Sequence, residues 1–186
     1  MTGGVVCLAL VIAAFVAARA AAAGEKPDEY RVKAAFIVNF ARFVEWPNEA
    51  FADAGSPIIV GVVGDDPFDG ALGKALSGRT AHGRSLVCRR VKVGPEMRAC
   101  HLLFISASER KRLKQLLGML RETSVLTIGE VGEFTESGGI INFLVADNRV
   151  GFEVNVGAAE EARLKISSRV LRLAREVTGR GGGDPR

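Results

Sequence analysis

The sequence lacks the short motifs that mark most hydrolases and metal enzymes. G-x-S-x-G and H-E-x-x-H do not occur, and no cysteine is placed with both a histidine and an orienting partner. His82 and His101 stand alone, and no C-x-x-C pair supplies metal ligands. No G-K-[ST] sequence closes a phosphate-binding loop. We therefore expect no catalytic residues, no metal and no cofactor, which favours binding over catalysis.

Charge of one sign is not concentrated in any part of the chain. The formal net charge is +4 over 186 residues, and Lys and Arg alternate with Asp and Glu. The basic stretch from Arg169 to Arg180 has the pattern of a solvated helix face. We therefore expect no nucleic-acid partner.

The N-terminus carries the one long apolar run, from Val5 to Ala18. Arg19 interrupts it before it reaches the roughly 20 residues that a membrane span needs. Ala21-Ala22-Ala23 then fits the small-residue pattern of a cleavage site, although no Lys or Arg precedes the run. We interpret residues 1–23 as a secretory signal peptide cleaved near Ala23.

The remaining chain has the length of one domain, which we place at residues 24–178, with a disordered tail at 179–186. Strands alternate with helices along it, which predicts an α/β fold: a mainly parallel sheet with flanking helices, closed by a C-terminal antiparallel hairpin. The predicted strands are Ile58 to Val63, Ser85 to Val93, His101 to Ser106 and Val125 to Ile128. The predicted helices include Glu29 to Trp46, one begun by Ser106 or Ser108, and Ser167 to Val177.

The hairpin is the stretch that sequence specifies best. Two apolar runs, Ile140 to Val145 and Val150 to Val156, flank a turn in which Asp and Asn tolerate positive φ. Glu153 and Asn155 alternate with apolar residues and form its polar face. Two interpretations remain open for them: recognition of a partner, or hydrogen bonds to a loop or to arginines of the first helix.

A second candidate site lies where parallel strands end. Asp65, Ser106 and Glu130 each follow a predicted strand, and open α/β sheets bind small ligands at this carboxyl edge. Asp66 before Pro67 has the pattern of a helix cap, so the Asp65-Asp66 pair does not by itself indicate a magnesium site.

Two cysteines remain after signal cleavage, Cys88 and Cys100. An exported protein could join them in one disulfide. If Cys88 lies inside one strand and Cys100 at the start of the next, their side chains could instead face opposite sides of the sheet. The sequence leaves both outcomes open.

Five segments together resemble the YfiR family of periplasmic proteins. They are KAAFIVNFARFVEWP, GRSLVCRRV, CHLLFIS, LTIGEVGEFTESGGIINFLVADNRVGFEVN and KISSRVLRLAREV, in order and without large gaps from about Tyr30 to Val177. The resemblance implies a non-enzymatic periplasmic inhibitor that binds the sensor domain of an inner-membrane diguanylate cyclase. It also implies a homodimer and release by an outer-membrane YfiB-type lipoprotein. The two disulfides of YfiR cannot both exist here, because the mature chain has two cysteines.

Under this resemblance, the hairpin and the segment after it become the expected partner-binding region. We expect Phe152, Glu153, Asn155 and Ile166 to form or brace the surface that contacts the periplasmic domain of a cyclase or a sensor kinase. A periplasmic small-ligand binder that uses Asp65, Ser106 and Glu130 is the alternative.

Overall fold

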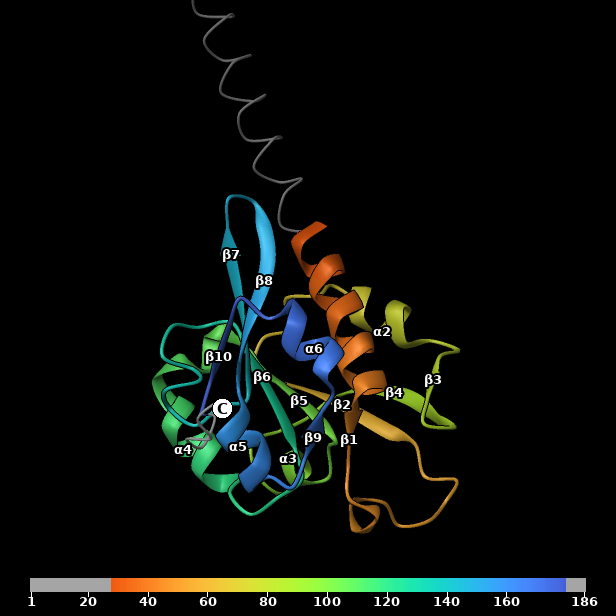
Figure 1. The fold of residues 1–186 in the computed structure, drawn as a ribbon. Coiled ribbons are helices and arrows are strands. Elements are labelled where there is room, and N and C mark those ends of the chain that lie inside the picture. The colour runs from red at the N-terminus through yellow and green to blue at the C-terminus, as the bar shows by residue number, and fades with distance from the viewer. Residues whose placement is uncertain (1–27, 180–186) are drawn as a thin grey trace, which may run out of the picture.

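The computed structural model describes residues 28–179, so the predicted signal peptide and residues 180–186 of the predicted tail lie outside the described residues. Within that range an eight-stranded sheet runs in the order β10-β8-β7-β6-β5-β2-β4-β3, and β1 and β9 form a small separate sheet (Figure 1). The pairs β4-β2, β2-β5, β5-β6 and β6-β7 are parallel, whereas β7-β8 is antiparallel. The predicted α/β fold with its hairpin is therefore confirmed.

The strands of the main sheet are β2 (Ile58–Val63), β3 (Thr80–Ala81), β4 (Arg84–Arg90), β5 (Leu102–Ile105), β6 (Leu126–Gly129), β7 (Ile141–Ala146), β8 (Arg149–Asn155) and β10 (Glu176–Thr178). The small sheet pairs β1 (Val44–Glu45) with β9 (Lys165–Ile166). The helical segments are 28–43, η1 (Asn48–Ala50), α2 (Ala71–Leu76), α3 (Pro95–Arg98), η2 (Ala107–Arg112), α4 (Leu113–Met119), α5 (Val156–Glu161) and α6 (Ser168–Leu173).

Two apolar clusters lie on opposite faces of the sheet. In β5, Leu102 and Phe104 belong to one cluster, while Leu103 and Ile105 belong to the other. This alternation explains why the central strands read as continuous apolar runs: both of their faces are buried. The helix 28–43, α2, α5 and α6 cover the first face, and α3 and α4 cover the second.

The helix 28–43 packs its aromatic residues against the hairpin. Phe40 lies 5.0 Å from Phe152 and 6.0 Å from Phe143 between ring centroids, and Phe36 lies 5.3 Å from Phe152. The prediction carried this helix to Trp46, but it ends at residue 43, because Val44 and Glu45 pair with β9.

The hairpin turn has the geometry that its sequence predicts. Asp147 and Asn148 have φ of 50° and 57°, and Ala146 pairs with Arg149. Two consecutive residues with positive φ match the twist of the flanking strands in a two-residue turn.

The C-terminal segment corrects one prediction. The sequence predicts a helix to Val177, but α6 ends at Leu173 and Glu176–Thr178 forms β10, parallel to β8. The backbone N–H of Arg175 donates to Phe152 O at 2.8 Å, so the chain turns onto the free edge of β8. Pairing with that edge outweighs the local helical pattern. The hairpin consequently lies one strand inside the edge of the sheet.

Residues 28–179 include no helix that is both long and apolar enough to cross a membrane.

Candidate functional site

Glu153 holds the loop that connects β6 to β7. Its Oε1 accepts hydrogen bonds from Thr135 Oγ1 at 2.9 Å and from Asn142 Nδ2 at 3.0 Å. Thr135 and Asn142 are buried, with 6% and 2% of their surface exposed. Because buried donors are costly to leave unpaired, Glu153 stabilises this arrangement.

Asn155 completes the same arrangement. Its Nδ2 donates to Thr135 O at 3.0 Å, and its Oδ1 accepts from Ala158 N at 2.9 Å and caps α5. The sequence left two interpretations open for Glu153 and Asn155. In the structure, both residues form hydrogen bonds to the β6–β7 loop. The helix 28–43 packs on the opposite face of the sheet.

The four residues predicted to contact a partner lie in different environments. Phe152 is 1% exposed and faces the helix 28–43, on the side of β8 opposite to Glu153. Ile166 lies on β9, half-buried and paired with Val44. The structure thus brings Glu153 and Asn155 together but separates Phe152 and Ile166 from them.

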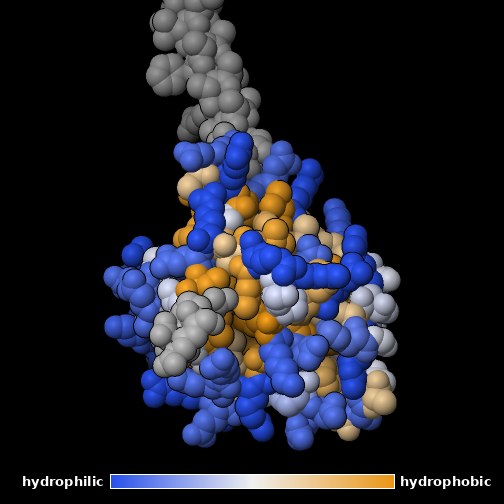
Figure 2. Space-filling view, in the orientation of Figure 1, coloured by the Kyte–Doolittle hydropathy of each residue, from blue (hydrophilic) through white to orange (hydrophobic). Residues whose placement is uncertain are grey.

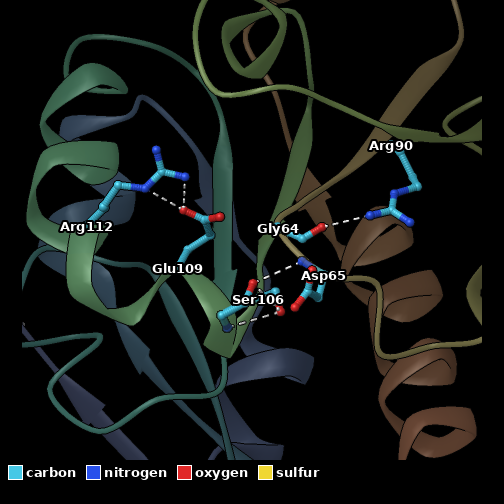
Figure 3. Close-up of polar contacts among 7 residues, drawn as sticks. Gly64, Asp65, Arg90, Ser106, Glu109 and Arg112 are labelled. Carbon is cyan, nitrogen blue, oxygen red and sulfur yellow. Dashed lines mark hydrogen bonds and ion pairs between the residues drawn. The ribbon is translucent and has the colours of Figure 1, made fainter.

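The carboxyl edge of β2 and β5 is the topological switch point of the sheet. From β2 the chain continues to β4 on one side, whereas from β5 it continues to β6 on the other. Open α/β sheets bind ligands in the crevice at such a point. Gly64 and Asp65 follow β2 there, and Ser106 follows β5 (Figure 3).

The chain itself fills this crevice. Ser108 Oγ accepts a hydrogen bond from Asp65 N at 2.9 Å, and Ser106 accepts from Ser108 N as the cap of η2. Gly64 has φ of +88°, and a Cβ there would lie 2.5 Å from Ser108 Oγ. Position 64 therefore requires glycine for two reasons: its positive φ and its close approach to Ser108.

Three charged side chains around the switch point form hydrogen bonds within the chain. Glu109 Oε2 accepts from Arg112 Nε at 2.9 Å and Nη2 at 2.6 Å, and Arg90 Nη2 donates to Gly64 O at 3.1 Å (Figure 3). The Ser108 hydroxyl thus anchors η2 to the end of β2. Asp65 and Ser106 come close together, with Ser108 bonded to both, whereas Glu130 lies in a separate ion pair.

Glu130 takes part in a separate buried ion pair. Its Oε2 lies 2.7 Å from Lys33 Nζ, and its Oε1 accepts from Tyr30 Oη at 3.3 Å. Lys33 is 2% exposed, contacts Glu29 as well, and lies 4.5 Å from the Tyr30 ring centroid. Burial and then the Glu130 carboxylate raise the pKa of Tyr30, so its hydroxyl stays protonated and donates. Glu130 therefore ties the first helix to the end of β6.

Sequence reasoning missed the partners of these residues. Lys33 begins the apolar stretch KAAFIVNF. A lysine that is buried with such a stretch needs a carboxylate partner, so the sequence could have indicated one. Thr135 and Asn142 carry no such signal, because they become neighbours of Glu153 only when the loop folds back.

The two cysteines are free thiols in the structure. Cys88 packs with the cluster on one face of the sheet and Cys100 with the cluster on the other. Cys88 lies in β4, and Cys100 precedes β5 on the other side of β2. Burial raises the pKa of Cys100 to about 11. The geometry is that of two unpaired, unreactive thiols.

His101 fastens the loop that precedes β2. Its Nδ1 accepts from Ile59 N at 3.1 Å, so Nε2 carries the proton and donates to Ala50 O at 3.1 Å. The ring stacks on Phe51 at 4.5 Å between centroids. Burial lowers the pKa of His101, because desolvation disfavours the charged ring.

These observations define a class of protein: a doubly wound α/β domain whose polar edge groups anchor its own loops. Within that class, the chain belongs to the YfiR/HmsC-like family, whose model matches residues 30–175. This is a regulatory rather than a catalytic family, and membership indicates a periplasmic regulator of cyclic di-GMP signalling. No curated protein sequence matches the chain significantly.

Two solved structures are similar in part. A conserved domain protein from Vibrio cholerae O1 biovar El Tor has 12% identity and a TM-score of 0.46, and the match covers 65% of this chain and 55% of the other. The ABC domain in complex with L-Trp from Streptococcus pneumonia has 11% identity and a TM-score of 0.46, covering 64% and 54%. The chain thus spans about half the length of each, and at these scores the likeness carries no functional argument.

Proposed function

We propose that this protein is exported to the periplasm, with its signal peptide removed near Ala23, and represses an inner-membrane signalling protein. It binds the periplasmic sensor domain of a diguanylate cyclase and keeps the enzyme inactive, which lowers cyclic di-GMP and limits biofilm formation. The observation that carries the proposal is the family match over residues 30–175.

An exposed apolar surface supports binding of a protein partner. Hydrophobic residues gather around α6 and the neighbouring β8 (Figure 2). Leu173, at the end of α6, is 68% exposed, while Leu171 on the same helix and Ile166 on β9 are half-buried. A surface where apolar residues gather and a large one is exposed is consistent with an interaction site.

The four residues predicted from sequence brace this surface in the proposal. Phe152 fixes the first helix on β8, and Ile166 fixes the start of the segment that leads into α6. Glu153 and Asn155 fix the β6–β7 loop on the other side of β8, and Asn155 also caps α5. Their role is to position the partner-binding region.

Isothermal titration calorimetry of the mature chain against purified periplasmic domains of diguanylate cyclases and sensor kinases tests the proposal. We expect saturable binding to one cyclase domain, lost in Leu173→Glu without a change in melting temperature. Val93→Glu is the matched control, because Val93 is also exposed, at 36%, but follows β4. No binding by the wild-type chain to any of these domains contradicts the proposal. The same titration with outer-membrane YfiB-type lipoproteins, and sedimentation of the chain alone, test the release partner and the homodimer.

A second candidate function is small-ligand binding at Asp65, Ser106 and Glu130. Asp65 and Ser106 lie at the switch point between β2 and β5, where open α/β sheets place ligands, and a ligand there would have to displace the hydrogen bond from Asp65 N to Ser108 Oγ. A thermal-shift screen against nucleotides, amino acids and vitamins tests it. A stabilisation that is lost in Ser106→Ala supports a ligand, whereas a flat response across the panel contradicts one.

A further inference from the structure

The tip of the β7-β8 hairpin projects beyond the body of the domain (Figure 1). β7 pairs with β6 through Ile141 and Asn142 alone. Its pairing with β8 continues to Ala146 at the turn. The segment Phe143–Ala146 therefore has β8 on one side and an open edge on the other.

The open edge offers backbone hydrogen-bonding groups to an incoming strand. Asn155 N donates to Ile140 O at 2.8 Å, so the C=O of Ile140 faces β8, while its N–H donates to Thr127 Oγ1 of β6 at 3.0 Å. Along an antiparallel pair this orientation alternates. The N–H and C=O of Val145 consequently point away from β8, into the open edge.

The two edges of the hairpin tip differ in protection. On the β8 side, the Arg175 side chain lies against Gly151, and its Nη2 reaches Arg149 O at 3.5 Å. On the β7 side, the strand Ile141–Ala146 carries no charged residue. Proteins normally protect free strand edges with charge, proline or a covering loop. Because it lacks these devices, the β7 edge can accept another strand, whereas the β8 edge is blocked.

A groove lies next to this edge. It has a volume of about 650 Å³ and runs between the start of the first helix and the hairpin tip. Val32, Val145 and Val150 line it together with the polar residues Asp28, Glu29, Asn148 and Arg149. Val32 and Val145 are 44% and 51% exposed. A strand added beside β7 would place alternate side chains on the Val145 side of the sheet, next to these valines.

We propose that Phe143–Ala146 binds an extended segment of the partner protein by strand addition. Backbone complementarity selects an extended main chain, and Val32, Val145 and Val150 favour apolar side chains at the alternate positions that reach them. This inference rests on the proposed function, because it names the contact through which the cyclase's periplasmic domain is held.

Val145→Pro is the test variant. Proline removes the outward N–H and obstructs an added strand, but leaves the bonds between Ala146 and β8 intact. Val145→Thr is the matched control, since it keeps the N–H and the β-branched shape. We expect the affinity for the periplasmic domain to fall at least about tenfold in Val145→Pro and to change less than about twofold in Val145→Thr. Circular dichroism and melting temperature verify that both variants fold.

Amide hydrogen exchange on the wild-type complex gives a second readout that needs no variant. The Val145 amide should exchange more slowly in the complex than in the free protein. Unchanged exchange at Val145, or wild-type affinity in Val145→Pro, overturns strand addition while leaving the proposed function standing. Absence of any wild-type binding overturns both. If sedimentation shows that Val145→Pro abolishes self-association but not partner binding, the occupant is a second copy and the inference is wrong.

Discussion

Replacing Glu153 by alanine gives the sharpest prediction about stability. The substitution removes the acceptor shared by Thr135 and Asn142 and leaves the buried Asn142 amide without that partner. Hydrogen bonds to a charged group contribute about 1.5–3 kcal/mol each, and relaxation recovers part of the loss, so we expect a cost of about 2–4 kcal/mol. For a domain of this size, that corresponds to a fall in melting temperature of about 5–15 °C.

Thermal unfolding followed by circular dichroism measures this effect, and Glu153→Gln is the control. Glutamine keeps one carbonyl oxygen as acceptor, so we expect the control to lose no more than about 1 kcal/mol. A Glu153→Ala protein that melts within about 1 °C of the wild type would refute the bracing role. If that same protein also lost partner binding, Glu153 would instead contact the partner directly.

Three further predictions follow from buried groups. Lys33→Ala leaves the Glu130 carboxylate buried without its cation and should cost about 3–5 kcal/mol in urea unfolding, whereas an unchanged midpoint would show that the pair contributes nothing. Because the pKa of His101 is lowered below its usual 6.5, the unfolded chain binds more protons, so the free energy of unfolding should fall as the pH drops below about 6.5. In urea titrations at several pH values, the free energy of unfolding should depend less on pH in His101→Gln than in the wild type. Gly64→Ala should destabilise the protein by at least about 1 kcal/mol, because φ is +88° and Ser108 lies in the way; wild-type stability would contradict the close packing.

The elements predicted correctly from sequence are those with a strong local signal. β2, β5 and β6 are short apolar runs buried on both faces, and the Asp147-Asn148 turn specifies its own geometry. β1 and β9 were missed, because two-residue strands leave no periodicity to detect. β10 was predicted as helix, because nothing within RLAREV reports that the edge of β8 is free.

The site shows the same division between local and long-range information. Alternation along β8 predicted that Glu153 and Asn155 share a polar face. Their partner Thr135 lies 18 and 20 residues away in sequence, so only the folded loop reveals what they bind. Similarly, Glu130 was correctly placed at a strand end, but its partner Lys33 lies 97 residues earlier.

Cyclic di-GMP in living cells tests the central claim most directly. The measurement compares cells that lack this gene with cells complemented by the wild type or by Leu173→Glu, whose exposed side chain is not needed for folding. Repression of a diguanylate cyclase predicts that cyclic di-GMP rises on deletion, returns to normal with the wild type, and stays high with Leu173→Glu expressed at equal level. An unchanged cyclic di-GMP concentration on deletion, under conditions where the protein is present in wild-type periplasm, would contradict the account.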